Sequence, residues 1–289
     1  MENILEIKNL SKSFKDFTLK NISFSLPKGF ITGFIGPNGS GKTTTIKLIM
    51  NLLKKDSGEI NVFGLDHIKH EKEIKNRIGF VYDEDHFYEE LTISEMKHII
   101  APVYDKWDEL KFKSYIKKFN LPQSKRIKDL SRGMKVKFSL AVALSHNADM
   151  LIMDEPTSGL DPLVRSEILG ILYDMIQDEN KGIFFSTHIT SDLDRIADYI
   201  VMIDGGDILF CTPKDELLEN HTVVKGSLSL LNSIGNLNMI GTRKNRYGFE
   251  ALSSDKKTTS AFARAGAVID KPTLEDIMLY YTRKEHPHA

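Results

Sequence analysis

The chain has 289 residues, of which 41% are hydrophobic and 27% charged, as in ordinary globular proteins of one large domain or slightly more. Its formal net charge of -1 lacks the basic excess that accompanies nucleic-acid binding. The sequence has no uninterrupted apolar run of about 18 residues that could span a bilayer, and its first residues lack the layout of a secretory signal. The single cysteine, Cys211, excludes an internal disulfide. These features predict a soluble cytoplasmic protein without a nucleic-acid partner.

The N-terminal part of the chain changes from strand-like to helix-like patterning. Residues 4–26 alternate between apolar and polar side chains and end at Pro27, which predicts short antiparallel strands. Residues 30–36 are nearly all apolar, as in a strand that is buried on both faces, and a helix-like segment follows from residue 42. Residues from about 71 to 138 are predicted to be mainly helical.

The remaining elements predict an α/β core with a mostly parallel sheet. Residues 150–154 and 182–186 have the pattern of short buried strands, and a helix-like segment separates them. A hairpin is predicted around Gly205-Gly206. After Pro213 the sequence is polar and interrupted by glycines, which predicts a small α+β appendage that ends in an amphipathic helix capped by Thr273. We therefore expect a first domain at 1–213, with a helical insert at about 84–144, and an accessory region at 214–289.

The segment GPNGSGKTT fits the phosphate-binding pattern G-x-x-x-x-G-K-[ST] between a strand and a helix. Its glycines allow successive backbone N–H groups to turn toward phosphate oxygens, and the helix N-terminus adds partial positive charge. Lys42 would contact the β- and γ-phosphates, and the Thr43 hydroxyl would ligate Mg²⁺. The predicted nucleotide-binding residues are Gly36, Pro37, Asn38, Gly39, Ser40, Gly41, Lys42, Thr43 and Thr44.

Two further strand ends carry residues suited to nucleotide hydrolysis. Asp154 ends an apolar strand and would support the metal, while the adjacent Glu155 could polarise a water for attack on the γ-phosphate. His188 ends another strand, where it could contact the γ-phosphate or the attacking water. Taken alone, the acids could be solvated surface groups and the histidine a structural residue.

The segment DLSRGMK contains a second candidate anion site. Ser131 precedes a helix-like segment as an N-cap candidate, and a loop of small residues that opens a helix can hold an anion. The alternative is that Ser131 only caps its own helix. Since the chain already has a phosphate-binding loop, the ligand of a second loop must be explained.

The order GPNGSGKTT, LSRGM, LIMDEPTSGLD and STH closely resembles the nucleotide-binding subunit of an ATP-binding cassette (ABC) transporter, over about residues 4–213. The resemblance implies a RecA-like P-loop core with an antiparallel β subdomain and an inserted helical subdomain. It also implies a head-to-tail dimer, in which Ser131 and Gly133 of one cassette bind the ATP held by the phosphate loop of a second cassette.

The same resemblance assigns roles to single positions. It implies that Lys42 and Asp154 act with Mg²⁺, that Glu155 is the general base and that His188 is the switch histidine. Asp161 would communicate between the two sites. Phe14 falls where the family places an aromatic that stacks on adenine, although by sequence alone it could equally be a core residue.

The sequence departs from the family pattern at two places. The signature usually reads LSGGQ, whereas here Arg132 and Met134 occupy its third and fifth positions. A glutamine that the family places after the strand at residues 78–81 is missing; Asp83 aligns best and would be a metal ligand, unless this acidic loop is merely solvated.

The resemblance implies an ATP hydrolase that powers a separate integral membrane permease from the cytoplasmic face of the membrane. Met134 and the segment FVYDED together suggest an exporter-like branch of the family, whose members export antibiotics, peptides or similar amphiphiles. Two alternatives were considered: a soluble cassette ATPase acting on ribosomes or DNA, and an ATP-sensing regulatory module. The ordinary helical insert and the net charge of -1 disfavour the first, and the intact Glu155 and His188 disfavour the second.

Overall fold

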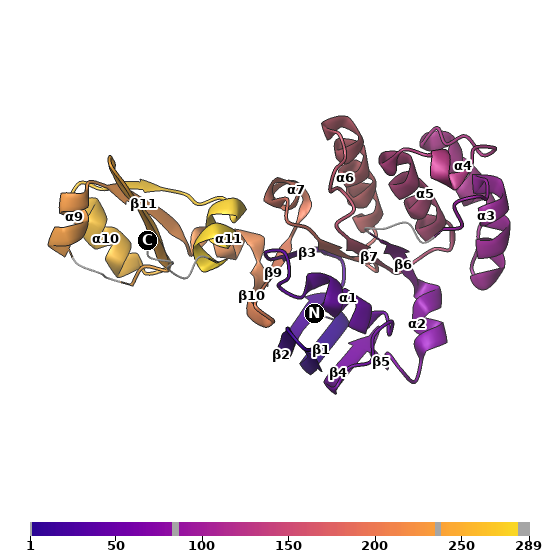
Figure 1. The fold of residues 1–289 in the computed structure, drawn as a ribbon, viewed down its shortest axis with the longest axis horizontal. Coiled ribbons are helices and arrows are strands. Elements are labelled where there is room, and N and C mark those ends of the chain that lie inside the picture. Colours follow the sequence, from indigo (N-terminus) through magenta and orange to yellow (C-terminus); the bar gives the residue numbers. More distant parts are fainter. Residues whose placement is uncertain (1, 83–86, 235–237, 283–289) are drawn as a thin grey trace.

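A computed structural model describes residues 2–82, 87–234 and 238–282, and its strands form three sheets (Figure 1). The first sheet is antiparallel and has the order β2-β1-β4-β5. Its strands are β1 (Asn3–Ser13), β2 (Thr18–Pro27), β4 (Ser57–Val62) and β5 (Leu65–Asp66). The predicted antiparallel strands of the N-terminal part are therefore confirmed.

The second sheet has six strands in the order β10-β9-β3-β8-β7-β6, and all neighbours except β10 and β9 run parallel. Its strands are β3 (Ile31–Ile35), β6 (Ile78–Val81), β7 (Met150–Asp154), β8 (Gly182–Ser186), β9 (Tyr199–Asp204) and β10 (Asp207–Pro213). Gly205 and Gly206 form the predicted hairpin turn, and both have positive φ, as a tight primed turn requires. The mostly parallel sheet predicted from the alternating elements is confirmed.

The segment predicted as mainly helical contains one strand as well as helices. β6 pairs with β7 at the edge of the parallel sheet, which places a strand at residues 78–81, where the family resemblance expected one. This apolar run of four residues is too short for periodicity to separate a strand from a helix, and pairing with β7 decides its structure.

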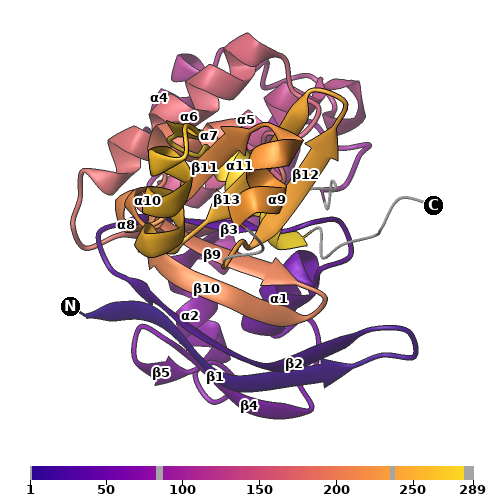
Figure 2. The same cartoon turned by 90° about the vertical axis from the view of Figure 1, so that its left-hand side faces the viewer.

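Helices occupy both faces of the parallel sheet, as Figures 1 and 2 show. On one face, α1 packs into a core that it shares with the antiparallel sheet. On the other face, α5, α6 and α7 cover a larger core that continues into the helices around α4. The helices of this part of the chain are α1 (Lys42–Ile49), α2 (Glu71–Arg77), α3 (Ile93–Ile100), α4 (Glu109–Lys118), α5 (Arg132–Ser145), α6 (Pro162–Ile176), α7 (Thr190–Ile196) and α8 (Lys214–Glu219), with short 3₁₀ turns at η1 (Ala101–Val103) and η2 (Ile127–Asp129).

The third sheet belongs to a C-terminal βαββαβ unit with the strand order β12-β13-β11-β14. Its elements are β11 (Thr222–Gly226), α9 (Leu228–Ile234), β12 (Gly241–Asn245), β13 (Gly248–Ser253), α10 (Lys256–Arg264) and β14 (Val268–Asp270). Phe249 and Phe262 pack in its core with ring centroids 5.6 Å apart, as expected for core residues.

A final helix, α11 (Leu274–Thr282), lies between this unit and α7 (Figure 1). It packs on α7 and on β12 and β13, and Leu274 and Ile277 are fully buried. The Tyr281 hydroxyl lies 2.9 Å from Nε2 of His221. Thr273 caps α11 as predicted, because its Oγ1 accepts from the Asp276 N–H while the Asp276 carboxylate accepts from the Thr273 N–H.

Candidate active site

The predicted phosphate loop connects the end of β3 to α1 and is shaped by its glycines. Gly39 and Gly41 have φ values of 79° and 114°, which side-chain-bearing residues rarely adopt. Gly36 is pressed against the Ile203 carbonyl oxygen, so that a Cβ there would overlap it. At Gly41 a Cβ would come within 2.9 Å of Phe17 Cζ. Pro37 is half-buried, Asn38 and Thr43 are exposed, and Thr44 is half-buried.

Lys42 is buried and folds back over this loop. Its Nζ donates to the Gly36 carbonyl at 2.8 Å and lies 3.7 Å from Oε1 of Glu155. Burial lowers the pKa of the ammonium group, while the carboxylates of Glu155 and Asp154 oppose this effect. The cation is therefore already placed between the loop and the acids at the end of β7.

Asp154 and Glu155 are joined through Ser186, which lies opposite Asp154 in the neighbouring strand β8. The Ser186 hydroxyl donates to Oδ1 of Asp154 at 2.5 Å and accepts from the Glu155 N–H at 3.1 Å. Glu155 has a φ of 48°, an uncommon backbone conformation for a residue with a side chain. Sequence analysis missed Ser186, although it precedes Thr187-His188 at a strand end.

The structure brings His188 and Glu155 together. The Glu155 Oε2 accepts from the His188 backbone N–H at 3.3 Å and lies 2.7 Å from its Nδ1. His188 remains exposed between β8 and α7, whereas the Glu155 side chain is only 13% exposed. His188 is therefore accessible from solvent while the Glu155 carboxylate beside it is largely enclosed.

Phe14 lies in the turn between β1 and β2 and is 43% exposed, so it does not belong to the core. Its ring centroid is 6.4 Å from that of Phe17, whose side chain contacts the phosphate loop at Gly41. The two rings form an apolar surface beside the loop. Phe17 is thus a second candidate for contact with the adenine ring, one that the sequence pattern did not indicate.

The second anion loop lies apart from the first (Figures 1 and 2). Ser131 is the N-cap of α5, and its Oγ accepts from the Met134 N–H at 3.3 Å. Gly133 is buried against Val164 of α6. Asp161 caps α6, because its Oδ1 accepts from the Leu163 and Val164 N–H groups at 3.1 Å each. The helix α1, which begins at the phosphate loop, packs on β7, whereas α5 packs on β6, α4 and α6. Ser131 and Gly133, at the start of α5, therefore lie on a different element from the phosphate loop. Asp83 lies outside the described residues.

The residues of the first loop fit a triphosphate. Its glycines leave a cradle that side chains would fill, and Lys42 is a buried cation at its centre. The Ser40 hydroxyl is buried without a hydrogen-bond partner among the residues that the structure describes. A phosphate oxygen would satisfy such a group, because a buried unpaired hydroxyl is costly.

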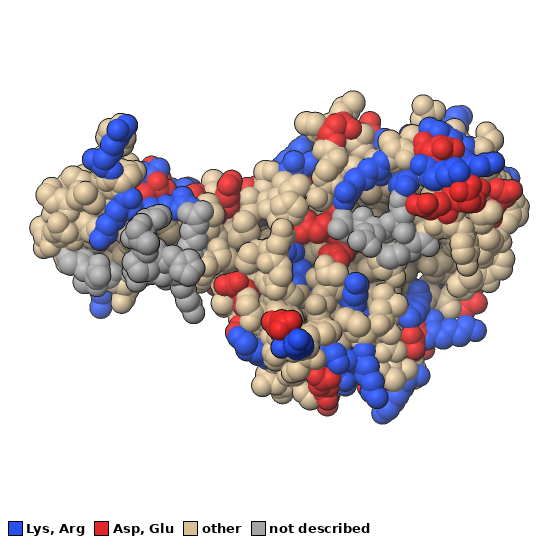
Figure 3. Space-filling view, in the orientation of Figure 1, with Lys and Arg blue, Asp and Glu red and all other residues tan. Residues whose placement is uncertain are grey.

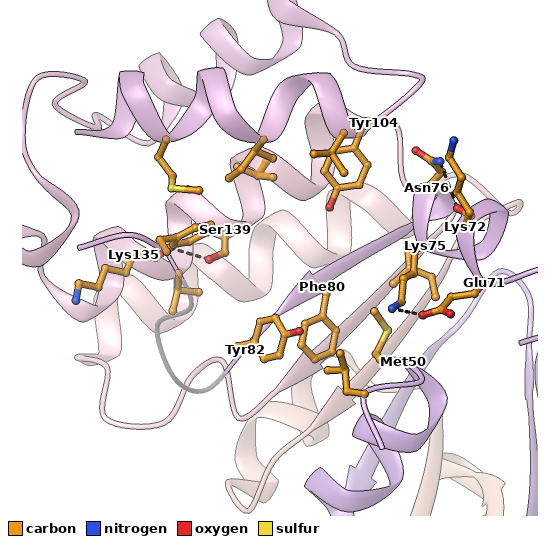
Figure 4. A pocket seen from close by; sticks show the side chains of 18 of the residues that line it. Met50, Glu71, Lys72, Lys75, Asn76, Phe80, Tyr82, Tyr104, Lys135 and Ser139 are labelled. Atoms are coloured by element: carbon orange, nitrogen blue, oxygen red, sulfur yellow. Dashed lines mark hydrogen bonds and ion pairs between the residues drawn. The ribbon is translucent and has the colours of Figure 1, made fainter. Parts of the chain in front are cut away.

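A groove of about 1230 Å³ lies between α2, β6 and the helices α3 and α5 (Figure 4). Phe80 and Tyr82 point into it from β6, and Tyr104 lies across from them (Figure 4). Its apolar floor is bordered by five basic side chains and by the acidic Glu71 and Glu89, and Figure 3 shows lysine and arginine over α2 with acidic side chains beside them. The basic residues that line it are Lys69, Lys72, Lys75, Arg132 and Lys135.

Comparison with known proteins identifies the family. A profile described as "ABC transporter" matches residues 19–158. The bacitracin transport ATP-binding protein BcrA of Bacillus licheniformis is 33% identical over 224 residues, which cover 76% of this chain and 73% of the relative. The linearmycin resistance ATP-binding protein LnrL of Bacillus subtilis is 30% identical and covers 96% of this chain and 98% of its own length.

Solved structures agree with this assignment. An ATP-binding subunit of an ABC transporter superimposes with a TM-score of 0.68 and 27% identity, over 75% of this chain and 92% of that structure. CbiO1 of Clostridium perfringens, at 24% identity and a TM-score of 0.65, shares the fold over 76% of this chain and 92% of its own.

The chain therefore belongs to the ATP-binding subunits of ABC transporters. As a member of that family it is an ATP-binding protein and an ATPase coupled to transport. Within the described residues, every helix is too short or too polar to cross a membrane.

Proposed function

We propose that the loop from Gly36 to Thr44 binds Mg-ATP and that Glu155 acts as the general base for its hydrolysis. The observation that carries this proposal is the position of the Glu155 carboxylate, 2.7 Å from Nδ1 of His188 and 3.7 Å from Nζ of Lys42. A carboxylate held between two such groups beside a phosphate cradle can accept a proton from a water that attacks the γ-phosphate. Lys42 would then leave the Gly36 carbonyl for the β- and γ-phosphates, and His188 would contact the γ-phosphate.

Two described residues are proposed to hold the metal. The exposed Thr43 hydroxyl at the start of α1 and the Asp154 carboxylate at the end of β7 supply the oxygen ligands that Mg²⁺ prefers. When bound, the metal neutralises charge on the phosphates during transfer. Asp83 stays a third proposed ligand, and Phe14 is proposed to stack on the adenine.

The second anion loop is proposed to serve a second cassette subunit. Ser131 is exposed at the N-terminus of α5, where the helix dipole favours an anion. In a head-to-tail dimer, the Ser131 hydroxyl and the Gly133 N–H would donate to the γ-phosphate held by the other subunit. Asp161, exposed at the start of α6, would communicate between the two sites.

The partner in the membrane is proposed to be a separate permease that uses the groove beside α2. An apolar floor with a basic border suits an amphipathic segment from a cytoplasmic loop of that permease. The chain would then be held peripherally at the cytoplasmic face of the membrane. The names of BcrA and LnrL refer to bacitracin transport and linearmycin resistance, which supports export of an antibiotic, a peptide or a similar amphiphile.

The test is the Glu155→Gln variant of the full chain. Because glutamine cannot accept the proton, we expect Mg²⁺-dependent ATP hydrolysis to fall by about 100-fold or more while ATP still binds. Hydrolysis is measured as phosphate release and binding by equilibrium titration with ATP.

Tagged Glu155→Gln protein with ATP should also retain a polytopic membrane protein from detergent-solubilised membranes of its native cell. Undiminished hydrolysis would contradict the role of Glu155, and recovery of ribosomes or nucleic acid instead of a membrane protein would contradict the transporter role.

A further inference from the structure

Arg132 replaces a glycine of the usual family signature, and the structure gives the direction of its side chain. It is the first residue of α5, between the N-cap Ser131 and the buried Gly133. A Cβ built on Gly159 would lie 3.5 Å from Nη1 of Arg132 and 3.8 Å from both its Cδ and its Cζ. Nη1, Cδ and Cζ of Arg132 therefore lie beside Gly159, at the distance at which a side chain on Gly159 would touch them.

Gly159 belongs to the turn that connects the proposed base Glu155 to Asp161. The turn starts at Glu155 with a φ of 48° and passes through Gly159 with a φ of 68°. The turn is anchored at its start, where the Glu155 N–H donates to the Ser186 carbonyl at 3.1 Å. Its later backbone hydrogen bonds are local, from the Ser158 N–H to the Glu155 carbonyl at 3.2 Å and from the Leu160 N–H to the Thr157 carbonyl at 3.3 Å. The exposed Gly159 has a left-handed backbone, so the shape of this later part of the turn depends on what lies against it.

The N-terminus of α5 lies beside Gly159 and packs on the start of α6. Gly133 approaches Val164 of α6 so closely that a Cβ would come within 2.8 Å of Val164 Cγ1. Arg132 extends this contact from α6 back to Gly159, and it also lines the groove beside α2. A glycine at position 132 would contact neither the turn nor the groove.

We propose that Arg132 is a positioning residue for ATP hydrolysis: its side chain holds the turn from Glu155 to Asp161 against the N-terminus of α5. This inference deepens the proposed function and rests on it, because the turn matters through the base at its start. It also links the second anion loop, at Ser131, to the hydrolytic residues of the same chain. The residue acts through Glu155 and touches no phosphate in this arrangement.

The test compares Arg132→Gly and Arg132→Lys in the full chain. We expect Arg132→Gly to lower kcat for Mg-ATP by about ten- to a hundredfold, as small displacements of catalytic groups do, with KM changed by less than about twofold. Arg132→Lys keeps the charge and much of the stem and should recover part of kcat. In the nucleotide-free protein, amide hydrogen exchange at residues 156–161 should become faster in Arg132→Gly, which is a readout independent of activity.

The matched control is Lys137→Ala, one turn further along α5, where Lys137 pairs with Glu167 of α6. This variant loses a basic contact between α5 and α6 that does not involve the turn, and it should keep both kcat and the exchange rates of residues 156–161. Wild-type kcat and exchange in Arg132→Gly would overturn the inference, as would an equal effect of Lys137→Ala. Wild-type protein without Mg²⁺-dependent hydrolysis would contradict the proposed function instead, and the exchange measurement would still decide the role of Arg132.

Discussion

Ser186 determines how the two acids at the end of β7 are presented. Its hydroxyl donates to Asp154 and accepts from the Glu155 N–H, so a single side chain fixes the orientation of both residues. The positive φ of Glu155 costs on the order of 1 kcal/mol for a residue with a side chain, and these bonds offset that cost. Strain of this kind persists where surrounding contacts over-determine the backbone, which is common at functional sites.

A second residue, His146, makes the free energy of unfolding depend on pH. It is buried at the end of α5, its ring stacks on Tyr104 at 3.8 Å, and its nitrogens face the carbonyls of Val142 and Ile78 at 3.1 and 3.2 Å. Burial lowers its pKa from 6.5 to about 4, although both carbonyls and the charge of Asp149 favour the protonated form.

Because the unfolded chain binds this proton below pH 6.5 and the folded chain only near pH 4, stability is fully present above pH 6.5 and falls as the pH drops toward 4. The loss from this residue is about 1.4 kcal/mol per pH unit, on the order of 3 kcal/mol in total.

Urea unfolding of wild type and His146→Gln at several pH values checks this prediction. Glutamine removes the titration, so the slope between pH 6 and 4 should be smaller in the variant; equal slopes would contradict the prediction. His67 and His221, whose pKa values burial also lowers, contribute to the slope of both proteins.

At the scale of elements, two glycines show opposite relations to their surroundings. Gly170 lies on the exposed side of α6, and a Cβ there would meet no atom within 4 Å. Gly33 lies in β3, and a Cβ there would come within 2.6 Å of Leu193 Cδ1. Gly170 has no packing role and lowers the stability of α6. Gly33 allows α7 to approach β3 closely.

We therefore expect Gly170→Ala to stabilise the protein by about 0.5–1 kcal/mol, because alanine loses less backbone entropy on folding. Gly33→Ala should destabilise it by about 1–3 kcal/mol, since Leu193 or the strand must shift. Thermal and urea unfolding of both variants measures these changes. A destabilised Gly170→Ala would show that α6 makes a contact at this position that the structure lacks.

Strong patterns at this scale made most elements predictable from the sequence. The apolar runs at β3, β7 and β8, the glycine pair of the hairpin and the Thr273 cap gave the correct structures. The strand β6 was expected from the family resemblance and not from its own pattern, because four residues carry no periodicity. The approach of Ser186 to Asp154 depends on β8 lying beside β7, and strand order is not contained in local sequence. The phosphate loop was predictable because its function requires fixed residue types at fixed spacing.

At the scale of the whole molecule, the C-terminal unit shares a core with the nucleotide-binding part. Leu274, Ile277 and Tyr280 of α11 join the same cluster of buried residues as Leu193 of α7 and Val223 and Leu252 of the third sheet. The unit is attached further by Tyr281, whose ring meets that of Phe210 at 5.3 Å. This continuity predicts that the two parts unfold together.

Ile277→Ala tests this continuity, because Ile277 is fully buried between α7 and the third sheet. Loss of its side chain should cost about 2–5 kcal/mol. Differential scanning calorimetry should show a single transition in wild type and a lower one in the variant. Two separate transitions in wild type, of which only one responds to Ile277→Ala, would contradict a shared core. Val268→Ala, at a 59% exposed position of β14, is the control and should leave the transition unchanged.

The packing of α11 on α7 also has a consequence for the order of events during synthesis. Leu193 of α7 packs against β3 at Gly33, three residues before Gly36. The helix α6 contacts α7 as well, but the contacts from α11 come from residues made about eighty positions later. While the ribosome translates the intervening βαββαβ unit, the part of α7 that α11 covers stays open to water and to chaperones. The packing behind the strand that leads into the phosphate loop is therefore completed late in the production of the chain.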